Sequence, residues 1–446
     1  GTYNVHDPSC CKLGDYYYMY STDAILGENR KEAEEKNVPL GFIQVRRSKD
    51  LVKWEFIGWA FPEIPHEAVE WVRSHADGKG ATNIWAPYII PFGDKYRLYY
   101  CVSAFGLKTS YIGLAESASP EGPWMQRGCV VKTDATSVMN AIDPSIIADS
   151  ATGKWWMHYG SFFGGLYCVE LNPETGLPVQ EGDQGHLIAR RATYWKDNLE
   201  APEIIYNPEL KQYYLFVSYD PLMTTYNVRV GRSDKAEGPF VDYFGVELKD
   251  TTNNFPILTA PYRFNNHPGW AGTAHCAVFT SDEGQYFMAH QGRLSPHNQM
   301  MDIHLRQVFF TSDGWPVVSP ERYTGSASRK FSAADIVGEW EIIRVQEPAY
   351  ERQLQAGQIL WGEGQLKNEE WNVSCTLSLK KDGQLDENKG YWKFAERGQL
   401  LSLTLNGEYV DNLLVFAGHD WENETETVLF TGLDSRGRSV WGKRTK

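Results

Sequence analysis

The sequence predicts an all-β protein, a five-bladed β-propeller followed by a second, smaller C-terminal antiparallel domain built as a β-barrel or sandwich. One strand–turn–strand unit recurs five times at a spacing of roughly 55 to 80 residues, which is typical of a repeat fold. Aromatic residues make up 14% of the chain. The pattern changes to strict alternation near residue 331, which predicts a separate domain.

The clearest copy of the unit spans residues 140–161. Asp143-Pro144 leads into an apolar stretch, a polar turn follows at 149–153, and then comes the aromatic strand Trp155–Tyr159. β-Branched and aromatic runs bounded by Gly, Asp and Ser predict a β-hairpin. A carboxylate beside Pro144 fits poorly in a buried strand. We therefore expect Asp143 where the strand emerges at an opening.

The other four copies begin in the same way. Their first residues are His6-Asp7-Pro8, Trp85-Ala86-Pro87, Glu200-Ala201-Pro202 and, more loosely, Ala274-His275-Cys276. In a propeller the first strand of each blade faces the central channel, so these positions converge on one mouth of that channel. A simpler reading is that proline starts each strand. That reading explains the prolines but not the three carboxylates and one histidine.

The predicted order of elements follows from these copies. Residues 1–60 form blade one, with a charged helical or loop insert at 27–37; residues 61–82 form a polar surface loop; blades two to five span 83–130, 140–180, 195–245 and 250–320. The small residues 325–328 form a linker. The predicted domains are thus 1–325 and 331–446, the second with alternating strands at 340–343, 375–379, 401–405 and 428–430.

Composition excludes several classes of partner. The net charge of −14 over 446 residues disfavours nucleic acid and anionic membranes. The seven scattered cysteines contain no CxxC pair, so they predict neither a disulfide framework nor a zinc site. No apolar run reaches the length of a membrane span. We expect a monomer that is secreted, periplasmic or at the cell surface, with a trimmed N-terminus because Asp7 lies so close to Gly1.

Three acids form the candidate catalytic set. Asp7 and Asp143 occupy the same strand start in blades one and three, and Glu200 lies one residue earlier in blade four. An Asp before Pro is by itself an ordinary turn residue. Three acids facing one another would raise the pKa of one of them by mutual repulsion, an arrangement suited to general acid/base hydrolysis.

Further site residues are predicted around the same mouth. His275 fills the equivalent position in blade five, either as a hydrogen-bonded channel histidine or as a ligand to a hydrated cation. Trp85 with Phe105, Phe162 and Phe163 would floor or flank the mouth as flat platforms for a sugar. The predicted substrate-binding residues are Trp85, Phe105, Asn140, Ser161 and Phe162.

These motifs resemble the family 43 glycoside hydrolases, specifically the endo-acting α-1,5-L-arabinanases, over nearly the whole chain. The resemblance rests on segments 140–145, 159–165, 200–202, 103–106, 110–115, 225–233 and 314–323. It implies that Asp7 is the general base, Glu200 the general acid, and Asp143 the residue that tunes and orients the acid. It also implies that His275 is the protein ligand of a largely water-bound calcium ion, and that the C-terminal segment is the β-barrel appended to longer arabinanases.

The sequence departs from the family pattern at one place, and three alternative functions stay open. Pro221-Leu222-Met223 stands where the family carries Cys-Cys, which leaves endo against exo action open. The alternatives are an exo-acting arabinofuranosidase or xylosidase of the same family, a retaining fructan or sucrose hydrolase, and a non-catalytic glycan-binding propeller. The fructan hydrolases carry Arg-Asp-Pro and Glu-Cys where this chain has Ile142-Asp143-Pro144 and Glu200-Ala201. A binding propeller is expected to lack at least one of the three acids.

Overall fold

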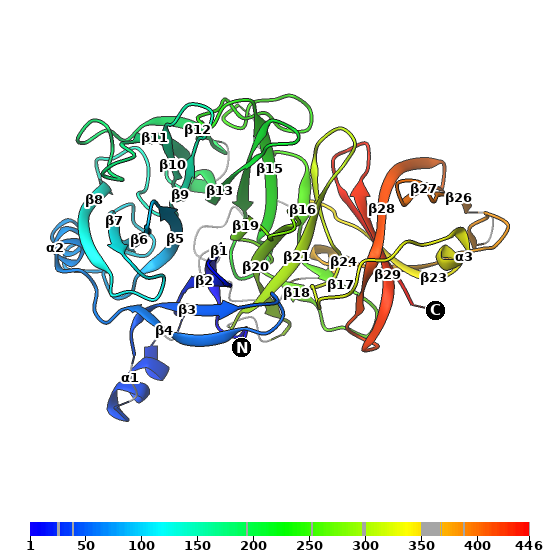
Figure 1. The fold of residues 1–446 in the computed structure, drawn as a ribbon, viewed down its shortest axis with the longest axis horizontal. Helices are drawn as coiled ribbons and strands as arrows, with labels where there is room; N and C mark the ends of the chain where they lie inside the picture. Colours follow the sequence, from blue (N-terminus) through cyan, green and yellow to red (C-terminus); the bar gives the residue numbers. More distant parts are fainter. Residues whose placement is uncertain are drawn as a thin grey trace.

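The computed structural model describes residues 1–24, 27–37, 40–192, 195–250, 253–296, 300–348, 366, 368–386 and 389–445. Within them, four sheets of four antiparallel strands follow one another along the chain (Figure 1). They are β1 (His6–Leu13), β2 (Tyr16–Thr22), β3 (Phe42–Ser48) and β4 (Glu55–Phe61); β5 (Trp85–Phe92), β6 (Lys95–Ser103), β7 (Ser110–Ser117) and β8 (Met125–Thr133); β9 (Ser145–Ala148), β10 (Trp155–Tyr159), β11 (Leu166–Leu171) and β12 (His186–Ala189); β13 (Leu199–Asn207), β14 (Gln212–Tyr219), β15 (Asn227–Ser233) and β16 (Ile257–Thr259). This is a propeller arrangement in an all-β fold.

A fifth group of strands pairs in the same consecutive order. β19 (Cys276–Thr280), β20 (Tyr286–Leu294), β21 (Asp302–Phe310) and β22 (Pro316–Val318) pair as neighbours. They belong to a larger sheet that also takes in β17 (Tyr262–Arg263), β18 (Trp270–Ala271) and β24 (Asn372–Val373). The first strands β1, β5, β9, β13 and β19 contact one another in a closed ring.

The first strands share a local distortion at their starts. In β1, β5 and β13 the register skips one residue, after His6, Trp85 and Glu200, as in a β-bulge. A bulge bends its strand and redirects the side chains next to it. The three strands are therefore expected to bend just after His6, Trp85 and Glu200.

Two sequence predictions about connecting segments have different outcomes. The charged insert is helix α1 (Gly27–Glu35), as expected. The predicted loop at 61–82 is wrong in part, because it contains helix α2 (His66–His75), which buries Ala68 and Val72. Residues four apart lie on one helix face, so this polar stretch has a narrow apolar side that packs against β6 and β7. Blade four also takes its last strand, β16, from beyond the predicted limit of 245.

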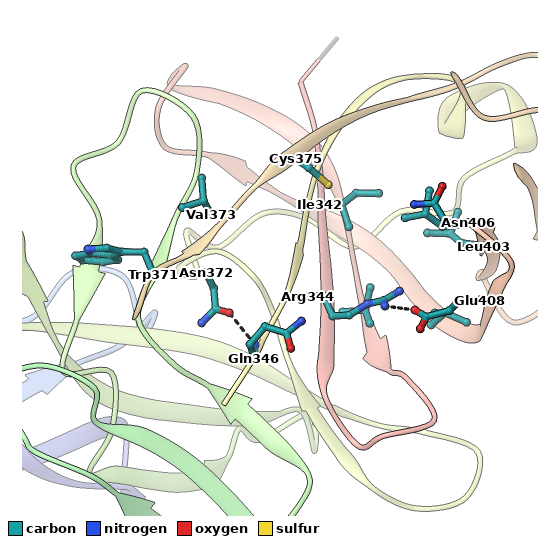
Figure 2. Close-up of a pocket in the computed structure, with 13 residues that line it drawn as sticks. Ile342, Arg344, Gln346, Trp371, Asn372, Val373, Cys375, Leu403, Asn406 and Glu408 are labelled. Atoms are coloured by element: carbon teal, nitrogen blue, oxygen red, sulfur yellow. Dashed lines mark hydrogen bonds and ion pairs between the residues drawn. The ribbon is translucent and has the colours of Figure 1, made fainter. Parts of the chain in front are cut away.

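The C-terminal part forms one antiparallel sheet of seven strands in the order β25-β23-β30-β29-β28-β27-β26. The strands are β23 (Gly338–Arg344), β25 (Cys375–Leu379), β26 (Gly390–Ala395), β27 (Leu400–Leu405), β28 (Glu408–Asp420), β29 (Thr425–Leu433) and β30 (Ser439–Arg444), with the short helix α3 (Ala333–Ile336) before them. A cavity of about 640 Å³ lies in this domain. Figure 2 shows its lining side chains, which include the ion pair between Arg344 and Glu408.

The two parts share a core and a network of hydrogen bonds. Trp441 and Ile343 of the C-terminal sheet pack in one apolar cluster with Tyr262 and Trp270. β24 pairs in parallel with β17, so a strand of the C-terminal part extends the sheet of the propeller. The side chain of Lys443 is fully buried between the domains. The C-terminal domain therefore packs directly against the fifth group of strands.

Candidate active site

Five strand starts carry the same backbone conformation. Asp7, Ala86, Asp143, Ala201 and His275 have φ angles of 49°, 39°, 58°, 54° and 52°. Positive φ costs a non-glycine residue of order 1 kcal/mol or more, so the surroundings must hold it in place. The conformation recurs at the positions that the repeat pattern singled out, and three of the five residues are titratable.

Side chains of the neighbouring strands satisfy the N–H groups of these five residues. Asp7 N–H lies 3.5 Å from Oε1 of Gln291, Ala86 N–H donates to Oγ1 of Thr22 at 2.9 Å, Asp143 N–H to Sγ of Cys101 at 3.2 Å, Ala201 N–H to Oδ2 of Asp143 at 3.1 Å, and His275 N–H to Oγ of Ser218 at 3.0 Å. Each acceptor belongs to the preceding group of strands. The strained positions are therefore linked around the ring.

Asp7 is buried and held by three side chains. Its Oδ2 accepts a hydrogen bond from Thr22 at 2.8 Å, and its Oδ1 lies 2.8 Å from Nδ1 of His275 and 3.3 Å from Nε2 of His6. Burial alone would raise the pKa of Asp7, but the imidazoles of His6 and His275 and the hydrogen bonds from His275 and Thr22 hold it well below its usual range. Asp7 is thus an ionised carboxylate at neutral pH.

Glu200 is held through both carboxylate oxygens. Ser161 donates a hydrogen bond to Oε2 and Tyr226 donates one to Oε1, each at 2.6 Å. Burial raises the pKa of Glu200, against the lowering effect of the hydrogen bonds from Ser161 and Tyr226. A buried carboxyl group with a raised pKa is suited to hold and release a proton near neutral pH.

Asp143 lies between the other two acids in the network. Burial, together with the charges of Glu200 and Asp7, raises its pKa well above the ordinary value, although His275 opposes the shift. Its Oδ2 accepts the N–H of Ala201, the residue after Glu200. Asp143 therefore fixes the backbone that carries Glu200 and adds a titratable group to the same cluster.

His275 contacts Asp7 rather than a cage of ligands. Burial would lower its pKa, but Asp7, with Asp143 and Glu200, raises the pKa of His275 to about 9. Among the described residues, one group of three His, Cys, Asp or Glu side chains has ligand atoms within 4.8 Å of one another, and it is Glu321, Asp420 and Glu422 around Lys443. A calcium ion prefers six to eight oxygen ligands. The residues at His275 fit a calcium ion only if water supplies most of its ligands.

The predicted substrate-binding residues fall into two groups. Trp85 and the half-exposed Phe105 pack edge to face, with ring centroids 6.3 Å apart. Phe162 is also partly exposed, and its backbone N–H donates a hydrogen bond to Leu199 O at 2.8 Å. Asn140 is buried and accepts a hydrogen bond from Ser110 at 2.6 Å. Ser161 is buried against Glu200. The aromatic rings are at least partly accessible, whereas Ser161 and Asn140 are buried, and only Ser161 bonds one of the three acids.

Tyr226 and Thr22 belong to the site, although the sequence pattern assigns them no role. Tyr226 lies between β14 and β15, and Thr22 ends β2, so neither sits at a first-strand start. Segment 225–233 is one of those that carry the family resemblance, but nothing in its pattern indicates that the hydroxyl of Tyr226 reaches Glu200. Thr22 could have been indicated by its position, because it ends the second strand of its blade and pairs with His6, next to the start of the first strand.

Residues 2–316 match the family described as glycosyl hydrolases family 43, and residues 320–442 match a C-terminal lipocalin-like domain. An extracellular endo-α-(1→5)-L-arabinanase of Thermotoga petrophila is 29% identical, over 99% of this chain and 94% of that protein. An extracellular exo-α-(1→5)-L-arabinofuranosidase of Cellvibrio japonicus is 30% identical, over 73% of this chain and 90% of that protein.

Solved structures agree with the sequence matches. The crystal structure of an endo-1,5-α-L-arabinanase from Thermotoga petrophila superposes with a TM-score of 0.81 at 26% identity, and the match covers 100% of this chain and 99% of that one. None of the helices in the described ranges is long and apolar enough to cross a membrane. The similarity thus extends over both domains.

Proposed function

Because the chain belongs to glycosyl hydrolase family 43, we propose that it is an endo-acting glycoside hydrolase that cleaves α-1,5-L-arabinofuranosidic bonds in arabinan with inversion. The observation that carries the proposal is the buried cluster of Asp7, Asp143 and Glu200. His275 contacts Asp7, the N–H of Ala201 bonds Asp143, and the charges of all three acids act on His275. The endo-arabinanase of Thermotoga petrophila, similar over both domains, supports the endo reading.

Glu200 is the general acid in this mechanism. It gives its proton to the glycosidic oxygen as the bond to the leaving sugar breaks. Its raised pKa keeps a larger fraction of the carboxyl group protonated at neutral pH. Ser161 and Tyr226 hold both oxygens, so the proton is delivered from a fixed position.

Asp7 is the general base. Its ionised carboxylate accepts a proton from a water molecule, which attacks the anomeric carbon on the face opposite the leaving group. Thr22 and His275 orient the carboxylate. Asp143 positions the backbone of Glu200, and repulsion between the two carboxyl groups raises the electrostatic cost of ionising the pair.

The strands β19–β22 act in this proposal as the fifth blade of the propeller. The closed ring of contacts among the five first strands supports it, as do the five matching backbone conformations. In this arrangement Asp7 and Glu200 belong to non-adjacent blades. A separation across the channel leaves room for the attacking water between acid and base.

A hydrated calcium ion near His275 is a further part of the proposal. His275 would be its protein ligand as a neutral imidazole, so the ion would have to displace the proton that the neighbouring acids favour. The ion would supply positive charge beside Asp7 and Asp143. The cluster of carboxylates at the mouth supports a cation there. Extracellular relatives support secretion of this chain.

The product profile on linear arabinan tests the proposal. An endo-acting enzyme releases a mixture of oligosaccharides early and lowers the viscosity of the polymer quickly. Early release of one short product instead indicates the exo action of the Cellvibrio japonicus relative. Xylan and β-galactan are the controls, and hydrolysis of either one in place of arabinan would overturn the proposed substrate.

A further inference from the structure

Two tyrosines lie exposed on the outer face of the C-terminal sheet. Tyr391 on β26 and Tyr409 on β28 each keep 61% of their surface accessible. Both pair with Thr404 of β27, which lies between them. Residues directly opposite one another in adjacent strands point to the same face of a sheet, so the two rings lie on one face, about 10 Å apart across two strand spacings.

The alternation along these strands separates this face from the domain core. Trp392, Leu403 and Val410, the neighbours in sequence of the exposed positions, are buried in the core of the domain. β26 is the last strand of the sheet, and β26 and β27 lie at the end of the molecule away from the propeller (Figure 1). The tyrosine face is therefore open, and it is remote from the acids.

The side chains around the two rings are polar and balanced in charge. Thr404 lies between the rings, and in the next row Ser402 donates a hydrogen bond to Asp411 at 2.7 Å. Lys393 pairs directly with Ser402 across the strands and is exposed. Lys393 and Asp411 carry opposite charges, so this row of the face suits a neutral ligand rather than a polyanion or a polycation.

We propose that the Tyr391–Tyr409 face binds a chain of arabinan, and so holds the polymer at a site separate from the catalytic mouth. The proposal rests on the proposed function, since it takes its ligand from the polymer that the enzyme cleaves. Flat aromatic rings pack on the C–H faces of a sugar, and the hydroxyl, carboxylate and ammonium groups beside them bond its hydroxyls. Two rings on one flat face fit an extended chain of neutral sugars.

The experiment measures binding of linear arabinan in the Glu200→Gln background, which prevents hydrolysis during the assay. Affinity electrophoresis in gels that contain arabinan compares the parent with Tyr391→Thr, Tyr409→Thr and the double variant. Threonine keeps the β-propensity of the position, and far-UV circular dichroism verifies the fold. Tyr3→Thr removes an equally exposed tyrosine, at 61%, from the propeller and is the matched control.

We expect each single variant to bind arabinan more weakly than the parent, and the double variant to bind it about tenfold more weakly. Binding by the control should be unchanged. With Glu200 restored, the ratio of the rate on polymer to the rate on arabinotriose should fall in the double variant. Unchanged retardation of the double variant would overturn the surface site. A wild-type enzyme that leaves arabinotriose and arabinan intact would instead overturn the proposed function.

Discussion

The hydroxyl of Tyr226 donates a hydrogen bond of 2.6 Å to Oε1 of Glu200. This bond stabilises the ionised carboxylate, while burial favours the protonated form. Ser161 bonds the other oxygen at 2.6 Å. Burial and the two hydrogen bonds therefore shift the pKa of Glu200 in opposite directions, and burial has the larger effect.

Replacing Tyr226 by Phe removes that bond and leaves the ring. The pKa of Glu200 should rise further, because the ionised form loses a donor. Glu200 acts when protonated, so activity is lost as pH rises through its pKa, and the basic limb of kcat/KM should move to higher pH. We also expect kcat at the pH optimum to fall about tenfold, the effect of one lost hydrogen bond to a charged group.

Tyr99→Phe is the control for that profile, because the buried Tyr99 hydroxyl bonds Gly176 O at 3.0 Å. Its pH profile should match that of the wild type. If Tyr226→Phe also leaves the basic limb in place, Tyr226 does not position the acid.

Glu200→Gln and Asp7→Asn should each lose roughly 10²–10⁴-fold in kcat, the contribution of one general acid or base. Both changes are nearly isosteric, so circular dichroism should show a native fold. Glu203→Gln is the matched control, since Glu203 is also buried on β13 but bonds Ser145 and the N–H of Val278 between strands. Retention of more than about a tenth of wild-type turnover in either variant would remove that residue from its assigned role.

Lys443→Met should destabilise the protein strongly. The ammonium group of Lys443 lies 2.9 Å from Glu321 and 3.1 Å from Asp420, and it also contacts Glu422. Removing one partner of a buried ion pair costs about 3–5 kcal/mol, because the remaining charges are left unpaired. Urea unfolding measures the loss.

Lys154→Met serves as the comparison, because Lys154 pairs with Glu170 at 2.9 Å and is 49% exposed. A surface pair of this kind contributes about 1 kcal/mol or less. If the two variants lose equal free energies of unfolding, the buried ion pairs of Lys443 do not hold the two domains together.

Removing calcium should lower both activity and melting temperature if the ion sits near His275. Exhaustive chelation followed by assay and thermal unfolding checks this, with chelator saturated with calcium as the control. Loss that added calcium reverses supports the ion. Activity and melting temperature that both survive chelation unchanged would remove it from the account.

The repeat pattern predicted that Asp7, Asp143, Glu200 and His275 lie at equivalent strand starts. It could do so because these residues recur at nearly the same position of the repeated unit. It did not predict the contact of Tyr226 with Glu200. That contact depends on how a turn 26 residues further on folds back, and no period in the sequence records it. Helix α2 was missed for a related reason, since a few buried residues in a polar stretch give a weak helical pattern.

Docking of the C-terminal domain was also beyond the sequence. The separate domain was predicted from its alternating strands, but the pairing of β24 with β17 joins residues about 110 positions apart. Lys443 likewise meets Glu321 across 122 residues. Such contacts arise from the final packing of the two parts, which local patterns do not specify.

The stereochemistry of the first product tests the central claim most directly. Proton NMR of the earliest time points, on an α-linked arabino-oligosaccharide, distinguishes the two anomers before they equilibrate. With Asp7 as base and Glu200 as acid on opposite faces of the sugar, water displaces the leaving group directly and the β-anomer appears first. If the α-anomer appears first, hydrolysis proceeds through a covalent intermediate, and the assignment of Asp7 as general base is wrong.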